Sequence, residues 1–190
     1  MLKRWNFLKM LFAISLILLI NCTRDKNNIT GYSVNRETGT TPEYFVYSTI
    51  LNSFKGNMAD AVFVLSDSTI SLNLSNEFNY IKINFPELQD ETFESYTTVN
   101  QQRIELLNIP DLDITCYLIN ARYAIYWKEL YPNAAALIHF SGVGFNPNED
   151  QALISVSKYI GPLGATASLI LLSKENNEWT IIKSVLLWTS

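Results

Sequence analysis

His139 is the only histidine in the chain, and Ser141 follows it two positions later. Side chains two positions apart on a β-strand leave the same face, so the pair could supply the imidazole and the hydroxyl of a nucleophilic site. Neighbours of this kind stand side by side, which rarely directs the hydroxyl at an imidazole nitrogen. The Gly-Val-Gly run that follows also differs from the Gly-x-Ser-x-Gly motif of hydrolases. We therefore expect His139 to be a hydrogen-bonded structural residue, with a hydrolase that uses His139 and Ser141 as the alternative.

Thiol and carboxylate chemistry have no defined site in the sequence. Cys116 would pair with His139 only if the fold brought them together, and its apolar neighbours predict a buried, inert thiol. Acidic side chains are plentiful, but their spacing fixes no pair at the separations that glycosidases use. The acids considered are Asp67, Glu91, Glu94 and Glu129. A hydrolase that uses carboxylates therefore stays an alternative.

The composition also argues against metals and cofactors. One histidine and at most one free cysteine cannot build the nitrogen and sulfur shell that zinc prefers. Residues 146–150 offer oxygen ligands, but they lack the alternating spacing and the glycine of an EF-hand loop. The chain has no phosphate-binding glycine loop and no dinucleotide fingerprint. We expect no metal and no cofactor, and an enzyme is the less favoured class.

Three aromatic residues, Tyr123, Tyr126 and Trp127, fall on one side of a predicted helix. Such a stripe usually packs into a core and less often walls a ligand cavity. We take two of these aromatic residues, together with the histidine and the serine described above, as candidates for a ligand pocket. The candidates are His139, Ser141, Tyr126 and Trp127.

The N-terminus has the pattern of an export signal. Lys3, Arg4 and Lys9 precede an apolar run at residues 10–20, which is shorter than the roughly 20 residues that a membrane-spanning helix needs. The run ends at Leu19-Ile20-Asn21-Cys22, which resembles the lipobox of bacterial lipoproteins. That resemblance implies cleavage before Cys22 and attachment of diacylglycerol to its sulfur. Asn21 stands where Gly, Ala or Ser is usual, and the alternatives are ordinary secretion with cleavage elsewhere or an uncleaved anchor.

The position of the lipobox-like motif predicts how the N-terminal part of the chain is divided. Residues 1–21 would be a signal peptide, and residues 22–41 a lipidated cysteine with a flexible polar tether. Removal of the three basic residues of the signal changes the formal net charge from −4 to −7, a charge that repels nucleic acid. We expect a bacterial cell-envelope protein held by its lipid. Thr23 after the cysteine favours the outer membrane over the inner one.

Residues 42–190 predict a single α+β domain with helices first and strands last. Thr41-Pro42 is a typical helix start and Gly56 a helix end, and further helices are predicted at 90–100 and 120–130. The alternation of apolar residues in 70–85 favours strand. The other predicted strands cover 61–65, 135–143, 151–160, 165–174 and 179–189. The short connections between the last four strands predict an antiparallel meander, against which about three helices pack.

The C-terminal third resembles a family of uncharacterised exported bacterial proteins. The shared features are a Tyr-Pro step at Tyr131-Pro132, the motif Ser-x-Val-Gly-Phe-Asn from Ser141 to Asn146, a Gly-Pro-Leu turn at Gly161, and a Trp-x-Ser close at Ser190. The resemblance implies a common fold and no known activity. Helices packed on a curved sheet are also similar to folds of the nuclear-transport-factor-2 type. We expect a lipid-anchored module that binds an unknown protein or a small molecule.

Overall fold

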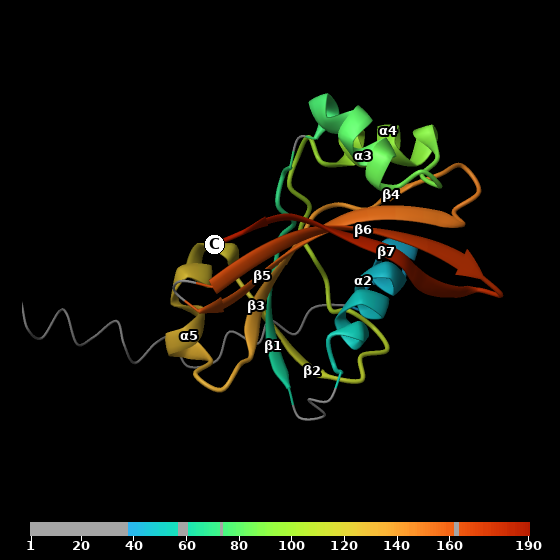
Figure 1. Cartoon of the computed structure of the whole chain (residues 1–190). Coiled ribbons are helices and arrows are strands. Elements are labelled where there is room, and N and C mark those ends of the chain that lie inside the picture. The colour runs from blue at the N-terminus through green and yellow to red at the C-terminus, as the bar shows by residue number, and fades with distance from the viewer. Residues whose placement is uncertain (1–37, 57–60, 73, 162–163) are drawn as a thin grey trace, which may run out of the picture. The chain divides into compact units, whose positions relative to one another are not determined.

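A mixed β-sheet forms the centre of the domain in the computed structural model, which describes residues 38–56, 61–72, 74–161 and 164–190 (Figure 1). The strands run in the order β2-β1-β3-β5-β6-β7, and β4 pairs with β5. Their bounds are β1 (Val62–Ser66), β2 (Thr115–Ile119), β3 (Ala136–Phe140), β4 (Gly144–Phe145), β5 (Gln151–Gly161), β6 (Gly164–Glu175) and β7 (Glu178–Thr189). With the helices that pack on this sheet, the predicted α+β class is confirmed.

The predicted meander is present in strands β3, β5, β6 and β7, which pair antiparallel in succession. The turn between β6 and β7 is Asn176-Asn177, and both residues have positive φ, at 52° and 67°. Two such residues favour the type I′ turn, whose twist matches that of the flanking strands. Local turn chemistry therefore explains why this part of the fold can be predicted from the sequence.

The described helices number four rather than about three, together with two 3₁₀ segments. They are α2 (Pro42–Ser53), α3 (Phe78–Asn84), α4 (Asp90–Val99), α5 (Trp127–Leu130), η2 (Ser75–Glu77) and η3 (Ala121–Tyr126). The strand predicted within 70–85 is wrong, because η2 and α3 occupy most of it. Ile81 and Phe85 are both fully buried at helical spacing, while Ile83 between them is 80% exposed. The apolar alternation therefore did not reflect the burial of this segment.

Two strands were not predicted, and both lie outside the four-stranded meander. β2 pairs parallel with β1, and β1 pairs parallel with β3, so the sheet is mixed. β4 is a pair of residues beside the start of β5. Strand β2 is short, and only Ile119 within it is fully buried. Such a strand forms because it can pair with the free edge of β1. Since β1 is distant in the sequence, the residues of β2 alone do not reveal this pairing.

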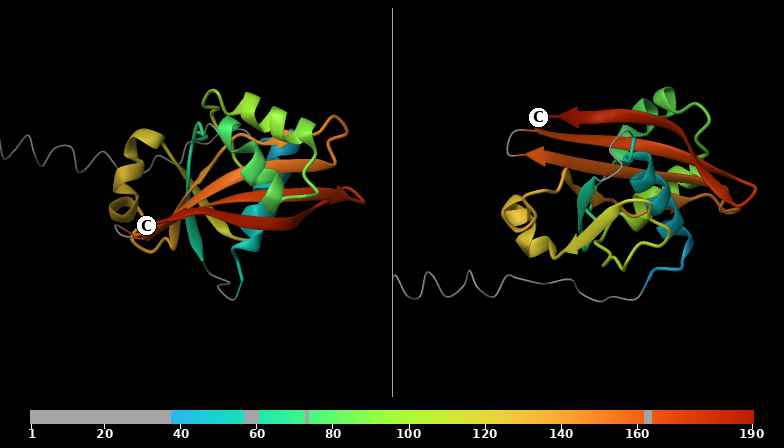
Figure 2. Two further views of the ribbon diagram at one scale, coloured as in Figure 1. Left: turned by 45° about the horizontal axis from the view of Figure 1, so that its top comes forward. Right: turned by 90° about the horizontal axis from the view of Figure 1, so that it is seen from below.

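Helices cover the sheet unevenly on its two faces. Helix α2 packs on the first face, where the ring of Tyr47 stacks on that of Phe140 with centroids 4.7 Å apart. On the second face, α3 and α4 cover Leu153 and Leu169 at one end, and η3 with α5 covers Val64 and Leu137 at the other. The views in Figure 2 place α2 and α3 on opposite sides of strands β5 to β7. The second face therefore has two separate helical covers.

Candidate functional site

A groove with a volume of about 530 Å³ lies between the η3–α5 cover and strands β3 and β5. Most of its lining is apolar or aromatic, which is usual for small-molecule sites. The lining residues are Ala121, Ala124, Ile125, Trp127, Lys128, Leu137, His139, Tyr159 and Gly161. The groove is therefore a candidate ligand site on the second face of the sheet.

The wall formed by η3 is fixed by a buried carboxylate at the end of β1. Asp67 Oδ1 accepts a hydrogen bond from the Ala121 amide, and Oδ2 accepts one from the Asn120 side chain, both at 3.0 Å. The side chain of Asn120 in turn caps η3 by accepting from the Arg122 amide. In a 3₁₀ helix residues three apart align, so Ala124 and Trp127 face inward and Tyr126 faces outward. The sequence predicted an α-helix through 120–130, and this change of period accounts for the exposure of Tyr126.

His139 is half-buried in the groove wall, and its ring meets that of Tyr159 edge-on at a centroid distance of 5.4 Å. Desolvation lowers the pKa of the imidazole below its usual 6.5, and the positive charge of Arg103 lowers it further. At neutral pH the ring is therefore neutral and offers one donor and one acceptor. Neither ring nitrogen is hydrogen-bonded to a residue that the structure describes, in contrast to the structural hydrogen bond expected from the sequence.

Small hydroxyl side chains continue from His139 across the second face. On one side of β3, Ser157 of β5 pairs with His139. On the other side, Leu65 of β1 pairs with Ile138, so the next residue of β1, Ser66, lies level with His139. The Ser66 hydroxyl is fully buried, and so are those of Ser155 and Tyr96 further along this face. Within the described residues none of these three hydroxyls makes a hydrogen bond of good geometry, although the Tyr96 hydroxyl lies beside those of Ser155 and Ser141.

The phenol of Tyr96 belongs to this polar strip. Burial raises its pKa, and the neighbouring hydroxyls of Ser155 and Ser141 partly offset that rise. A buried polar group left without a partner costs about 1–3 kcal/mol, so such groups in native proteins are normally satisfied by ordered water or a bound molecule. The strip between the two helical covers is therefore suited to polar atoms, and the groove beside it to apolar ones.

The structure brings together two of the four candidate pocket residues. His139 and Trp127 line the groove, whereas Tyr126 is 48% exposed outside it. Ser141 is fully buried, donates to the Gly142 carbonyl at 2.8 Å and accepts from the Ser155 amide at 2.9 Å. The proton of Ser141 is thus directed to a carbonyl, not to His139. Cys22, the candidate lipidation site, lies outside the described residues.

Other residues near the groove carry a signal in the sequence that the predictions did not include. On β5, Ser155, Ser157 and Tyr159 all leave the second face, and the residues between them are Val156 and Lys158. A strand buried on both faces rarely carries three polar groups in alternation unless they meet a partner. That alternation indicates a polar face on β5, and the register of β3 with β5 places His139 beside it.

Cys116 does not form a thiol–imidazole pair with His139. It packs with the core under α2 on the first face, whereas His139 lines the groove on the second. The residue is half-buried rather than fully buried, and desolvation raises the pKa of its thiol to about 12. The thiol is therefore protonated at neutral pH, the state of an unreactive cysteine.

No cluster of three or more His, Cys, Asp or Glu side chains suited to a metal ion occurs among the described residues. Within the same part of the chain, none of the helices has both the length and the apolar character that crossing a membrane requires. Comparison of the chain with protein-family models, with curated proteins and with solved structures finds no match. The groove and its neighbouring strip must therefore be interpreted from their own chemistry.

Proposed function

We propose that this protein is a lipid-anchored component of a bacterial cell envelope that binds a small amphipathic molecule in the groove beside His139. The lipobox-like sequence at Cys22 supports the anchor. The resemblances to uncharacterised exported proteins and to curved folds of the nuclear-transport-factor-2 type are part of the same proposal. Two acyl chains on one cysteine hold a protein on a membrane stably, since each buried methylene contributes about 0.8 kcal/mol.

The single observation that carries the binding role is a neutral imidazole without a described hydrogen-bond partner, set in a groove of apolar side chains. The apolar part of a ligand would lie against Trp127, Leu137 and Tyr159. Its polar head would accept a hydrogen bond from His139. The charge of Arg103, which acts on His139, favours a head group that is negatively charged.

We expect Cys22→Ala to abolish acylation, because the thioether can form only at that sulfur. Cys116→Ala is the matched control, since Cys116 packs in the core and is the second cysteine of the chain. In cells given an alkyne analogue of palmitate, the wild type and Cys116→Ala should carry the label. Cys22→Ala should carry less than a tenth of it. Intact mass of the wild type should show residues 22–190 with lipid, and an unlabelled wild type that retains Met1 would contradict the anchor.

We expect His139→Phe to weaken binding of 2-naphthoate about tenfold, the loss that corresponds to one hydrogen bond of about 1.4 kcal/mol. The probe combines an apolar double ring with a carboxylate, and phenylalanine keeps a ring in the wall of the groove. Isothermal titration calorimetry on the purified protein measures the affinity. Tyr126→Phe is the control, because Tyr126 is exposed outside the groove. Equal affinity in the wild type and His139→Phe, or no binding to the wild type, would refute this site without bearing on the anchor.

A further inference from the structure

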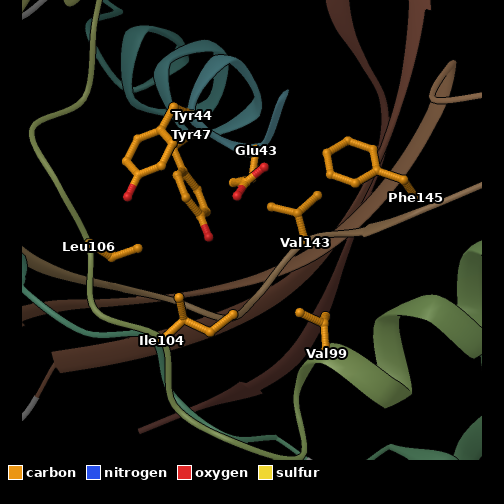
Figure 3. A pocket seen from close by; sticks show the side chains of 8 residues that line it. All are labelled: Glu43, Tyr44, Tyr47, Val99, Ile104, Leu106, Val143 and Phe145. Atoms are coloured by element: carbon orange, nitrogen blue, oxygen red, sulfur yellow. The ribbon is translucent and has the colours of Figure 1, made fainter. Parts of the chain in front are cut away.

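A second pocket lies on the first face of the sheet, at the start of α2 (Figure 3). It has a volume of about 140 Å³ and shares no lining residue with the groove. Its lining comes from α2, from the end of α4, from the chain before β2, and from the segment around β4. The lining residues are Glu43, Tyr44, Tyr47, Val99, Ile104, Leu106, Val143 and Phe145.

The pocket has a buried floor and an accessible rim. Tyr47, Leu106 and Val143 of the floor are each less than 7% exposed, whereas Ile104 on the rim is 39% exposed. Val99 is half-buried beside it. A dry cavity of about 150 Å³ takes a molecule the size of benzene, so this pocket suits a ligand of about five to seven heavy atoms.

Among the described residues that line this pocket, Glu43 alone carries a charge. Glu43 is the second residue of α2, after Pro42, and Figure 3 shows its carboxylate directed among the pocket side chains. It makes no ion pair or hydrogen bond with another residue in the described ranges. Its charge contributes, after burial, to the raised pKa of the Tyr47 hydroxyl, which shows that the negative potential reaches the floor.

Aromatic rings surround this carboxylate, and their hydroxyls already have backbone partners. Tyr44 Oη accepts from the Leu107 amide at 2.8 Å, and Tyr47 Oη donates to the Ser141 carbonyl at 3.3 Å. The two rings meet edge-on with centroids 5.6 Å apart, and the ring of Phe145 lies across the pocket (Figure 3). Both tyrosine hydroxyls are therefore already hydrogen-bonded to the backbone. The aromatic rings and the Glu43 carboxylate then determine which ligand the pocket can bind.

We propose that this pocket binds a small alkylammonium group. A carboxylate supplies the counter-charge, and aromatic rings attract a cation through their quadrupoles, an arrangement that proteins use for quaternary ammonium groups. An anion would be repelled by Glu43. A neutral apolar molecule would bury the carboxylate without compensation, which is costly. A hard metal cation needs six or more oxygen ligands, and the pocket offers one carboxylate.

The test uses tetramethylammonium as the probe and tert-butanol as its neutral counterpart with the same number of heavy atoms. The methyl groups of Val99, Ile104 and Val143 report on the pocket directly by NMR of the purified protein. Tetramethylammonium should shift these signals in a saturable manner, and tert-butanol should bind at least tenfold more weakly. The groove on the other face does not enter this readout, so the result is independent of 2-naphthoate binding.

Glu43→Gln keeps the size of the side chain and removes its charge, so its affinity for tetramethylammonium should fall at least tenfold. Glu91→Gln is the matched control, because Glu91 also lies in the first turn of a helix but is exposed on α4. Its affinity should equal that of the wild type. Unchanged methyl spectra without ligand show that each variant is folded. No saturable shift in the wild type, equal binding of tert-butanol, or undiminished binding by Glu43→Gln would each overturn the proposal.

Discussion

Gly144→Ala is expected to lower the free energy of unfolding by about 3 kcal/mol, the upper part of the range for overpacking a core. A Cβ atom at this position would collide with the backbone nitrogen and Cα of Tyr96 in α4. Backbone atoms in the middle of a helix cannot move singly, so the whole of α4 would have to shift away from β4. The shift would loosen the cover over Leu153 and Leu169, which α4 helps to bury.

Chemical and thermal denaturation measure this effect, and for a domain of this size the melting temperature should fall by about 10 °C. Gly161→Ala is the control, because a Cβ atom there would meet no other atom within 4 Å. We expect its stability to remain within about 0.5 kcal/mol of the wild type. A Gly144→Ala protein as stable as the Gly161→Ala protein would show that α4 does not contact β4 through the backbone.

Asn100→Ala is expected to cost about 2–3 kcal/mol, because the buried Gly142 amide loses its partner and the Gly142 carbonyl keeps only the Ser141 hydroxyl. The Asn100 side chain accepts from the Gly142 amide at 2.8 Å and donates to the Gly142 carbonyl at 3.1 Å. It also donates to the Tyr96 carbonyl at the end of α4. Asn100 is 1% exposed, so water cannot easily replace these bonds after the substitution.

The control is Asn84→Ala at the end of α3. Asn84 also donates to the carbonyl four residues earlier, that of Tyr80, but it makes no described bond to a strand. Because its surroundings are exposed, water can replace the bond, and we expect a cost below about 1 kcal/mol. Urea denaturation of both variants separates the two cases. Equal costs would indicate that the contact between Asn100 and Gly142 contributes little to stability.

Elements with local signals were predicted, and elements that depend on distant partners were not. The Thr41-Pro42 step predicted α2, and Asn176-Asn177 predicted the last hairpin. The parallel pairing of β2 with β1 joins Phe63 to Cys116, and no property of either segment alone specifies it. A segment as short as 78–84, in which apolar and polar residues alternate, is compatible with strand and helix until its packing partners are known.

In the candidate site, too, residues with a local signal could be predicted, and residues brought together by the pairing of distant strands could not. His139 and Trp127 could be identified from residue type and helical position, and the structure places both in the groove. Ser66 could not be associated with His139, because they are neighbours only through the register of two parallel strands. The amphipathic stripe that suggested Tyr126 assumed an α-helical period, which η3 does not have.

The mixed topology also determines the order in which the sheet can assemble. Strand β1 lies between two strands that come later in the chain, and its nearer neighbour in sequence, β2, begins only at Thr115. The hairpins of the C-terminal third connect residues close in sequence, and such contacts form fastest because their loops are short. A growing chain that has not reached β2 therefore has no strand to pair with β1. Both edges of β1 then remain without a strand partner until residues 115–140 have been synthesised.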